Sequence, residues 1–93
     1  MTSALRTELM DIAKRAAAYI NRLNGECQTF EIEGATMTAV ISYEAEIGED
    51  PGDRWTAPGW WIESESSRVR ALYDNEEGEE DPEAARWLEN MLN

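Results

Sequence analysis

Apolar residues recur every three or four positions over the first quarter of the chain. This spacing predicts an amphipathic helix over residues 3–23. The stripe consists of Leu5, Leu9, Ile12, Ala16, Ile20 and Leu23, widened by Ala13 and Tyr19. Thr2 or Ser3 supplies a side-chain oxygen that caps the first N–H groups. Asn24-Gly25 ends the helix, because glycine accepts a left-handed backbone without strain.

The pattern then changes to alternation of apolar and polar residues, which predicts strands over residues 27–32, 36–47 and 60–73. The second strand alternates most cleanly and is interrupted only by Val40. In the third strand the apolar parity changes partway along. The apolar residues of this strand are Trp60 and Ile62 before the change, and Val69, Ala71 and Tyr73 after it. We therefore expect a β-bulge near residues 66–67.

A second helix follows the acidic run DNEEGEED at residues 74–81, which predicts a solvated loop. Asp81 is a suitable N-cap, Pro82 fits the first helical position, and the acid Glu83 faces the positive helix end. The apolar side of this helix is Ala84, Leu88, Met91 and Leu92, with Trp87 at its edge. We predict one domain over residues 1–93, of the two-layer α+β class. It consists of an N-terminal helix, a three-stranded antiparallel sheet (a meander) and a C-terminal helix.

The net charge of the chain indicates more about its binding partners than the rest of its composition does. The chain holds 20 acidic and 8 basic residues, a net charge of −12 at pH 7. Residues 1–25 are slightly basic, whereas residues 26–93 hold 18 acidic residues against four arginines. Such a field repels nucleic-acid phosphates and anionic membranes and attracts basic partners. We therefore expect no direct nucleic-acid binding, no membrane binding and a protein partner of basic character.

Most catalytic chemistry is excluded by the absence of histidine and the presence of a single cysteine, Cys27. A Ser-His or Cys-His nucleophile and a histidine-bearing zinc site are impossible, and no nucleotide-binding motif is present. We expect no catalytic residue, no cofactor and no metal site, and we expect Cys27 to be a buried or half-buried side chain. With neither a signal-peptide segment nor about 18 consecutive apolar residues, a cytoplasmic protein is expected.

Carboxylates are the only remaining groups for acid–base or metal chemistry. Pairs such as Glu44 with Glu46, or Glu63 with Glu65, lie two residues apart on one strand face. Among 20 acids such pairs arise by chance, so a carboxylate-only enzyme is the weakest alternative. The run at 74–81 fails the EF-hand pattern, because counting Gly78 as the sixth loop position places a tyrosine first.

The segment GEDPGDRWTAPGWW, residues 48–61, places three of the four tryptophans among turn residues. Turn signals at residues 50–52 and 57–59 predict a connection longer than a hairpin needs. In one interpretation the tryptophans fold back as a lid over the core. In the other, one or more rings stay exposed as a binding anchor, because adjacent Trp60 and Trp61 must face opposite sides of a strand.

The most favoured function is a non-enzymatic protein–protein interaction module. Its candidate partner-binding residues are Arg54, Trp55, Trp60 and Trp61. The alternative is an acidic, DNA-mimic-like inhibitor of a nucleic-acid-handling protein. Its candidate acidic surface is Glu44, Glu46, Glu49, Asp50, Glu76, Glu77, Glu79 and Glu80. A homodimer is a further alternative, since a short edge strand at residues 28–32 can pair with another copy.

The stretch ISYEAEIGEDPGDRWTAPGWWIESES, residues 41–66, resembles small uncharacterised proteins of bacteriophages and prophages. In those proteins an alternating strand with a tyrosine leads into a Pro-Gly-rich loop and then into an acid-rich strand. The matching residues here are Tyr43, Pro51, Gly52, Pro58 and Gly59. The resemblance implies a phage or prophage origin and no established activity, so it assigns no functional residue.

Overall fold

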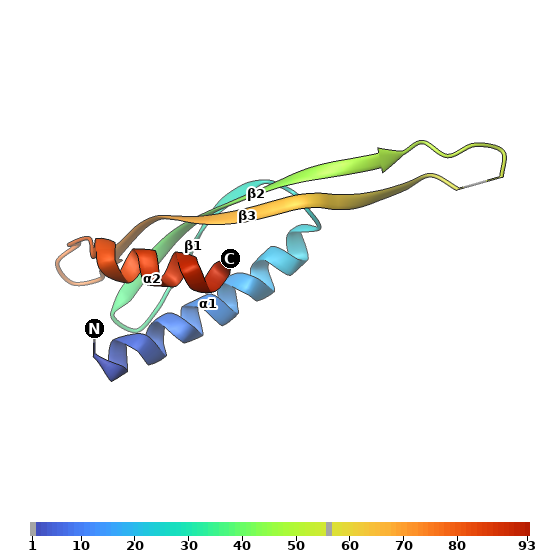
Figure 1. Cartoon of the computed structure of the whole chain (residues 1–93). Helices are drawn as coiled ribbons and strands as arrows, with labels where there is room; N and C mark the ends of the chain where they lie inside the picture. The colour runs from blue at the N-terminus through green and yellow to red at the C-terminus, as the bar shows by residue number, and fades with distance from the viewer. Residues whose placement is uncertain (1, 56) are drawn as a thin grey trace.

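The computed structural model describes residues 2–55 and 57–93 of the chain. Its elements, in chain order, are α1 (Ser3–Leu23), β1 (Gln28–Glu33), β2 (Met37–Asp50), β3 (Gly59–Asp74) and α2 (Pro82–Leu92). The strands form one antiparallel sheet in the order β1-β2-β3, and both helices pack on one face of it (Figure 1). The predicted α+β fold, a meander with a helix at each end of the chain, is confirmed.

Helix α1 begins and ends where its sequence indicates. The hydroxyl of Thr2 accepts a hydrogen bond from the Leu5 N–H at 3.1 Å, so Thr2 is the N-cap. At the other end Asn24 has φ 51° and Gly25 has φ 84°, both left-handed. A backbone of this kind ends a helix because it turns the chain away from the helix axis.

Helix α2 has the predicted cap, but its last turn packs less tightly than expected. Asp81 accepts a hydrogen bond from the Ala84 N–H at 3.1 Å, and Pro82 occupies the first helical position. Ala84 and Leu88 are buried. Met91, predicted to belong to the apolar side, is instead partly exposed, because it lies at the rim of a surface hollow beside Tyr43.

The three strands differ in how much of their length is paired. β1 pairs with β2 only from Gln28, opposite Tyr43, to Glu33, opposite Thr38. β2 and β3 pair along their whole length, from Met37 opposite Asp74 to Asp50 opposite Gly59. The β2–β3 hairpin therefore continues well past the end of β1. The prediction that residues 48–50 and 59 belong to a loop is wrong, since they extend the two strands.

Two bulges in β3 replace the single bulge that was predicted near residues 66–67. The register shifts between Glu46 and Ile47 and between Val40 and Ile41, which leaves Glu63 and Arg70 as the extra residues. Each extra residue reverses which parity of β3 faces the helices. Because of the second reversal Leu72 enters the core, whereas Ala71 and Tyr73 do not.

The core lies between the sheet and the two helices, over the part of the sheet that has three strands. Its fully or nearly fully buried members are Leu9, Ile12, Ala16, Phe30, Met37, Ala39, Ile41, Tyr43, Leu72, Ala84 and Leu88. Partly buried residues such as Tyr19, Ile20, Val69 and Trp87 pack around this cluster. The ring of Tyr19 contacts the ring of Phe30 with centroids 4.3 Å apart, which links α1 to β1.

Side chains of α2 cover the outer edge of β3 beside the core. Glu89 accepts a hydrogen bond from the Val69 N–H at 2.9 Å. Asn93 accepts one from the Ser67 N–H at 3.1 Å and donates one to the Ser67 carbonyl at 2.8 Å. An uncovered strand edge invites pairing with other chains, so these contacts protect β3 over this stretch.

The acidic loop after β3 is exposed, as predicted, but it is also held by backbone hydrogen bonds. Asp74 accepts from the N–H groups of Glu76 and Glu77 at 2.7 and 3.1 Å. The Asp81 N–H donates to the Leu72 carbonyl at 2.9 Å, which returns the chain to the edge of β3 before α2 begins.

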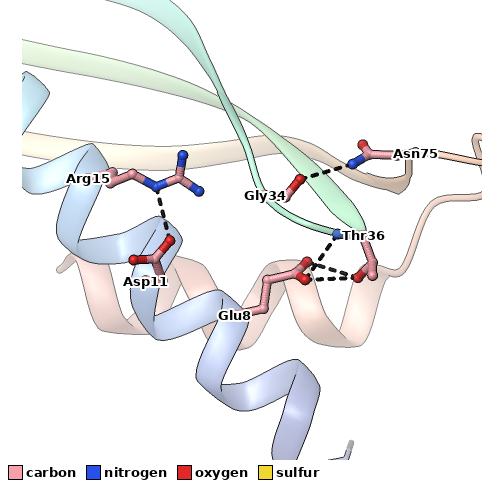
Figure 2. A network of polar contacts seen from close by, with 6 residues as sticks. All are labelled: Glu8, Asp11, Arg15, Gly34, Thr36 and Asn75. Carbon is pink, nitrogen blue, oxygen red and sulfur yellow. Dashed lines mark hydrogen bonds and ion pairs between the residues drawn. The ribbon is translucent and has the colours of Figure 1, made fainter.

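Polar contacts fasten α1 and the loop after β3 to the turn between β1 and β2 (Figure 2). The Glu8 carboxylate accepts hydrogen bonds from both the backbone N–H and the hydroxyl of Thr36 at 3.0 Å. The Asn75 side chain donates to the Gly34 carbonyl at 3.1 Å, and its oxygen accepts from the Thr38 hydroxyl. Figure 2 also shows Arg15 paired with Asp11 along α1 at 3.1 Å. This end of the molecule is therefore firmly connected.

The opposite end is an arm formed by the β2–β3 hairpin, residues 44–66. It projects far beyond the helices and makes the molecule elongated, with extents of 59 × 20 × 18 Å (Figure 1). The radius of gyration is 16.5 Å, whereas a compact domain of this length would have about 12 Å. The arm is thus the feature that departs most from an ordinary small domain.

Candidate functional site

The arm carries three large aromatic side chains that the core does not cover. The exposed fractions are 85% for Trp55, 55% for Trp60 and 49% for Trp61. The lid interpretation is therefore wrong, because the β2–β3 hairpin carries these residues away from the core instead of folding them over it. The rings stay exposed, as the anchor interpretation requires, and their role in binding stays a prediction.

Trp60 and Trp61 lie on opposite faces of the hairpin. Trp60 pairs with Glu49, and its face is the one that turns toward α1. Trp61 pairs with Gly48, and its indole lies so close to that glycine that a Cβ there would be 2.5 Å from the Trp61 Nε1. The ring thus occupies the space that a side chain at position 48 would fill.

Short side-chain hydrogen bonds shape the loop at the end of the arm. Asp50 accepts from the Gly52 N–H at 2.9 Å, and Gly52 has φ 78°. Asp53 accepts from the Trp55 N–H at 2.7 Å. Such Asx turns set the backbone direction locally. They leave Arg54 and Trp55, both predicted binding residues, exposed at the far end of the molecule.

A groove lies where the arm meets the C-terminal end of α1; we call it the arm-base groove. It encloses about 510 Å³. Its walls are Asn24, Gly25 and Glu26 from the end of α1, and Ile47, Glu49, Asp50, Pro51, Pro58, Gly59 and Trp60 from the arm. Gly25 packs directly against Ile47 and Ile62, so the end of α1 supports the base of the arm. Sequence analysis missed this groove, because it depends on how α1 and the hairpin meet.

The predicted acidic surface is split into two separate groups. Glu44, Glu46, Glu49 and Asp50 are exposed on the arm. The other four, Glu76, Glu77, Glu79 and Glu80, are exposed on the loop between β3 and α2, which lies at the opposite end of the molecule (Figure 1). The arm itself, residues 44–66, carries seven acidic residues and one basic residue, Arg54.

The Cys27 side chain is exposed, contrary to the prediction of a buried or half-buried thiol. Its sulfur lies over the edge of β2, where it accepts from the Ala45 N–H at 3.4 Å and donates to the Ala45 carbonyl at 3.6 Å. The prediction failed because Cys27 precedes β1 and sits outside the paired part of the sheet. This position leaves the thiol open to solvent.

Tyr43 forms a partly buried polar contact that was not predicted from the sequence. Its hydroxyl donates to the Glu65 carboxylate at 2.6 Å, and the residue is only 2% exposed. Burial raises the pKa of the Tyr43 phenol to about 12, and both the hydrogen bond and the negative charge of Glu65 act in the same direction. The alternation had already placed Tyr43 on the core face, and a buried tyrosine hydroxyl usually has a partner. A tyrosine on the core face was therefore the signal in the sequence that such a contact exists.

This contact predicts a pH effect at the alkaline end. The difference in absorbance at 295 nm between the wild type and Tyr43→Phe should rise with a midpoint near pH 12, not near the usual 10. Because the pKa is raised in the folded state, the stability linked to this group is fully present below pH 10 and is lost as pH rises from about 10 toward 12. A difference midpoint near 10 in protein that circular dichroism shows to be folded would contradict the assignment.

Other kinds of site find little support in the part of the chain that the structure describes. Across residues 2–55 and 57–93, no three acidic or cysteine side chains are grouped so as to hold a metal ion. Neither α1 nor α2 is long and apolar enough to cross a bilayer. The arm, with its tryptophans and the groove at its base, is therefore the candidate site.

Comparison with known proteins adds no further guide to this site. No family model matches the chain, and no curated protein or solved structure matches it either.

Proposed function

We propose that this protein is a non-enzymatic interaction module that binds a basic protein partner through its arm. The observation that carries the proposal is the exposure of Trp55, Trp60 and Trp61 on a hairpin that projects beyond both helices. Tryptophan is among the residues most enriched at the energetic centres of protein interfaces. Three tryptophans that the arm presents to solvent are better explained by binding to a partner than by a contribution to the folded core.

The construction of the arm supports the same proposal. A two-stranded hairpin is marginally stable by itself. β1 stops opposite Tyr43, and the α2 contacts with β3 begin at Ser67, so the arm has no third strand within the described residues. Contact with a partner would bury the rings and support the hairpin at once.

Charge selects the kind of partner. The arm is acidic, and the whole chain has a net charge of −12 at pH 7. Complementary charge steers the approach of a basic surface and disfavours acidic ones. It also opposes a homodimer through the arm or the β1 edge, since two copies repel each other. The proposed phage or prophage origin rests only on the resemblance of residues 41–66 and adds nothing to this argument.

The DNA-mimic alternative has less support. A mimic of duplex DNA presents a continuous row of negative charges, whereas the eight residues of the predicted acidic surface form two groups at opposite ends of the molecule. The exposed tryptophans also have no role in charge mimicry. This alternative nevertheless makes a distinct prediction, because an interaction that depends on charge alone weakens steeply with salt.

A capture experiment separates these proposals. The immobilised protein is incubated with lysate at about 0.1 M and about 1 M salt, between which the Debye length falls from about 10 to about 3 Å. The test variant is Trp55→Ala/Trp60→Ala. The control is Met10→Ala/Met91→Ala, which removes exposed apolar side chains from the helices instead. Circular dichroism first confirms that both variants are folded.

We expect a basic protein that is retained at both salt concentrations by the wild type and by the methionine control. The tryptophan variant should retain at least about tenfold less, because each interface tryptophan typically contributes about 2 kcal/mol or more. A nucleic-acid enzyme that is retained only at low salt, and equally by all three proteins, would favour charge mimicry. If no protein is retained above background by any of them, the proposed function is wrong.

A further inference from the structure

The lining of the arm-base groove is both apolar and acidic. Part of its lining is apolar and includes the half-exposed indole of Trp60 and the side chain of Ile47. The lining also includes the acidic residues Glu26, Glu49 and Asp50. A purely apolar ligand would desolvate these carboxylates without replacing their hydrogen bonds, so it fits the groove poorly.

Among the residues that the structure describes, no basic side chain pairs with the acids of the groove. The basic residues nearest to it in sequence are Arg22, in the last turn of α1, and Arg54, in the loop of the arm. Neither forms an ion pair across residues 2–55 and 57–93, and neither lines the groove. The C-terminal end of a helix also carries partial negative charge, and the end of α1 forms one side of the groove. The charged features of the groove walls thus favour a cation.

We propose that the arm-base groove binds an arginine side chain of the basic partner. This inference rests on the proposed function and adds the chemistry by which the partner is recognised. A guanidinium group has a flat face that stacks on an indole and a rim of N–H donors that pair with carboxylates. It therefore satisfies the Trp60 ring and the acidic residues of the groove at the same time. A lysine ammonium satisfies the carboxylates but offers no flat face to the ring.

The ladder of the hairpin fixes Glu49 and Trp60 relative to each other. Glu49 and Trp60 are directly paired across β2 and β3, so their side chains project from the same face. The main residues that recognise the guanidinium thus belong to strands rather than to the loop. Trp61, on the other face of the hairpin, has no part in this groove and provides a matched control.

The test uses short peptides and nuclear magnetic resonance. The probe is the acetylated and amidated tripeptide Ala-Arg-Ala. Its comparison peptides replace arginine with citrulline, which keeps the shape but lacks the charge, or with lysine. The indole N–H signals of Trp55, Trp60 and Trp61 are followed during titration. The variants are Trp60→Leu, Trp60→Tyr, Glu49→Gln and, as the control, Trp61→Leu.

We expect the arginine peptide to shift the Trp60 indole and the backbone signals of residues 24–26, and to bind at least about fivefold more tightly than the citrulline peptide. The lysine peptide should bind less tightly than the arginine peptide. Trp60→Leu and Glu49→Gln should weaken binding, whereas Trp60→Tyr and Trp61→Leu should largely retain it. Equal binding of arginine and citrulline, or shifts confined to Trp55 or to residues 76–80, would overturn the proposal. If that happened while the tryptophan-dependent capture of a basic partner persisted, the proposed function would stand without the groove.

Discussion

Replacing Leu88 with alanine should remove much of the stability of this protein. Leu88 lies on α2 with none of its surface exposed and belongs to the core between the helices and the sheet. Truncating a buried leucine typically costs about 3 kcal/mol or more, because apolar contacts are lost and a cavity remains. The total free energy of unfolding of a chain of this length is about 5–14 kcal/mol. The expected fall in melting temperature is about 12–24 °C.

Two control variants make this prediction specific. Leu88→Met keeps the volume and should cost less than about 1.5 kcal/mol. Met91→Ala removes a longer side chain from the same helix, but at a partly exposed position, and should change the free energy of unfolding by less than about 1 kcal/mol. Urea unfolding followed by circular dichroism measures all three. A Leu88→Ala loss no greater than that of Met91→Ala would show that the core is not closed by α2.

Gly25→Ala should destabilise the junction between α1 and the arm by about 2–3 kcal/mol. Gly25 has φ 84°, where an alanine is strained by about 1–2 kcal/mol. A Cβ at this position would also lie 2.5 Å from the Ile47 Cδ1, so Ile47 would have to rotate away. The backbone strain and the lost contact add together. The free energy of unfolding in urea reports the sum.

Gly78→Ala separates these two contributions. Gly78 has φ 72°, but no atom lies within 4 Å of the position of its missing Cβ, so this variant measures the backbone strain alone. Combining Gly25→Ala with Ile47→Ala removes the clash, so the double variant should be less destabilised than the sum of the two single variants. If Gly25→Ala costs no more than Gly78→Ala, the packing of α1 against the arm is not important for stability.

Both helices and the element order were predictable because the signals for them are local. Thr2, Asn24, Gly25 and Asp81 act on backbone groups within three or four residues of themselves, so their effect is visible in the sequence. The bulges were not predictable in position. Which residue of β3 becomes the extra one depends on how β3 lies against β2 and the helices, and the sequence of β3 alone does not contain that information.

The candidate binding residues were identified from sequence, but their environment was not. Trp60 and Trp61 were expected to face opposite sides, and they do. Whether a second layer covers them depends on how far the helices reach along the hairpin, which no pattern within residues 48–61 reveals. Gly48 was the one residue in the sequence that could have indicated where the Trp61 ring lies. A glycine within a strand often marks the close approach of another group, and here that group is the Trp61 indole.

The separation of arm and core has a consequence for how this sequence can change. Among the described residues between Ala45 and Val69, none belongs to the hydrophobic core. Substitutions at the end of the arm therefore alter what the protein presents to its surroundings while leaving its folding largely unaffected. Residues 51–58 form a natural position for randomised libraries, in which new specificities can be selected on an unchanged scaffold.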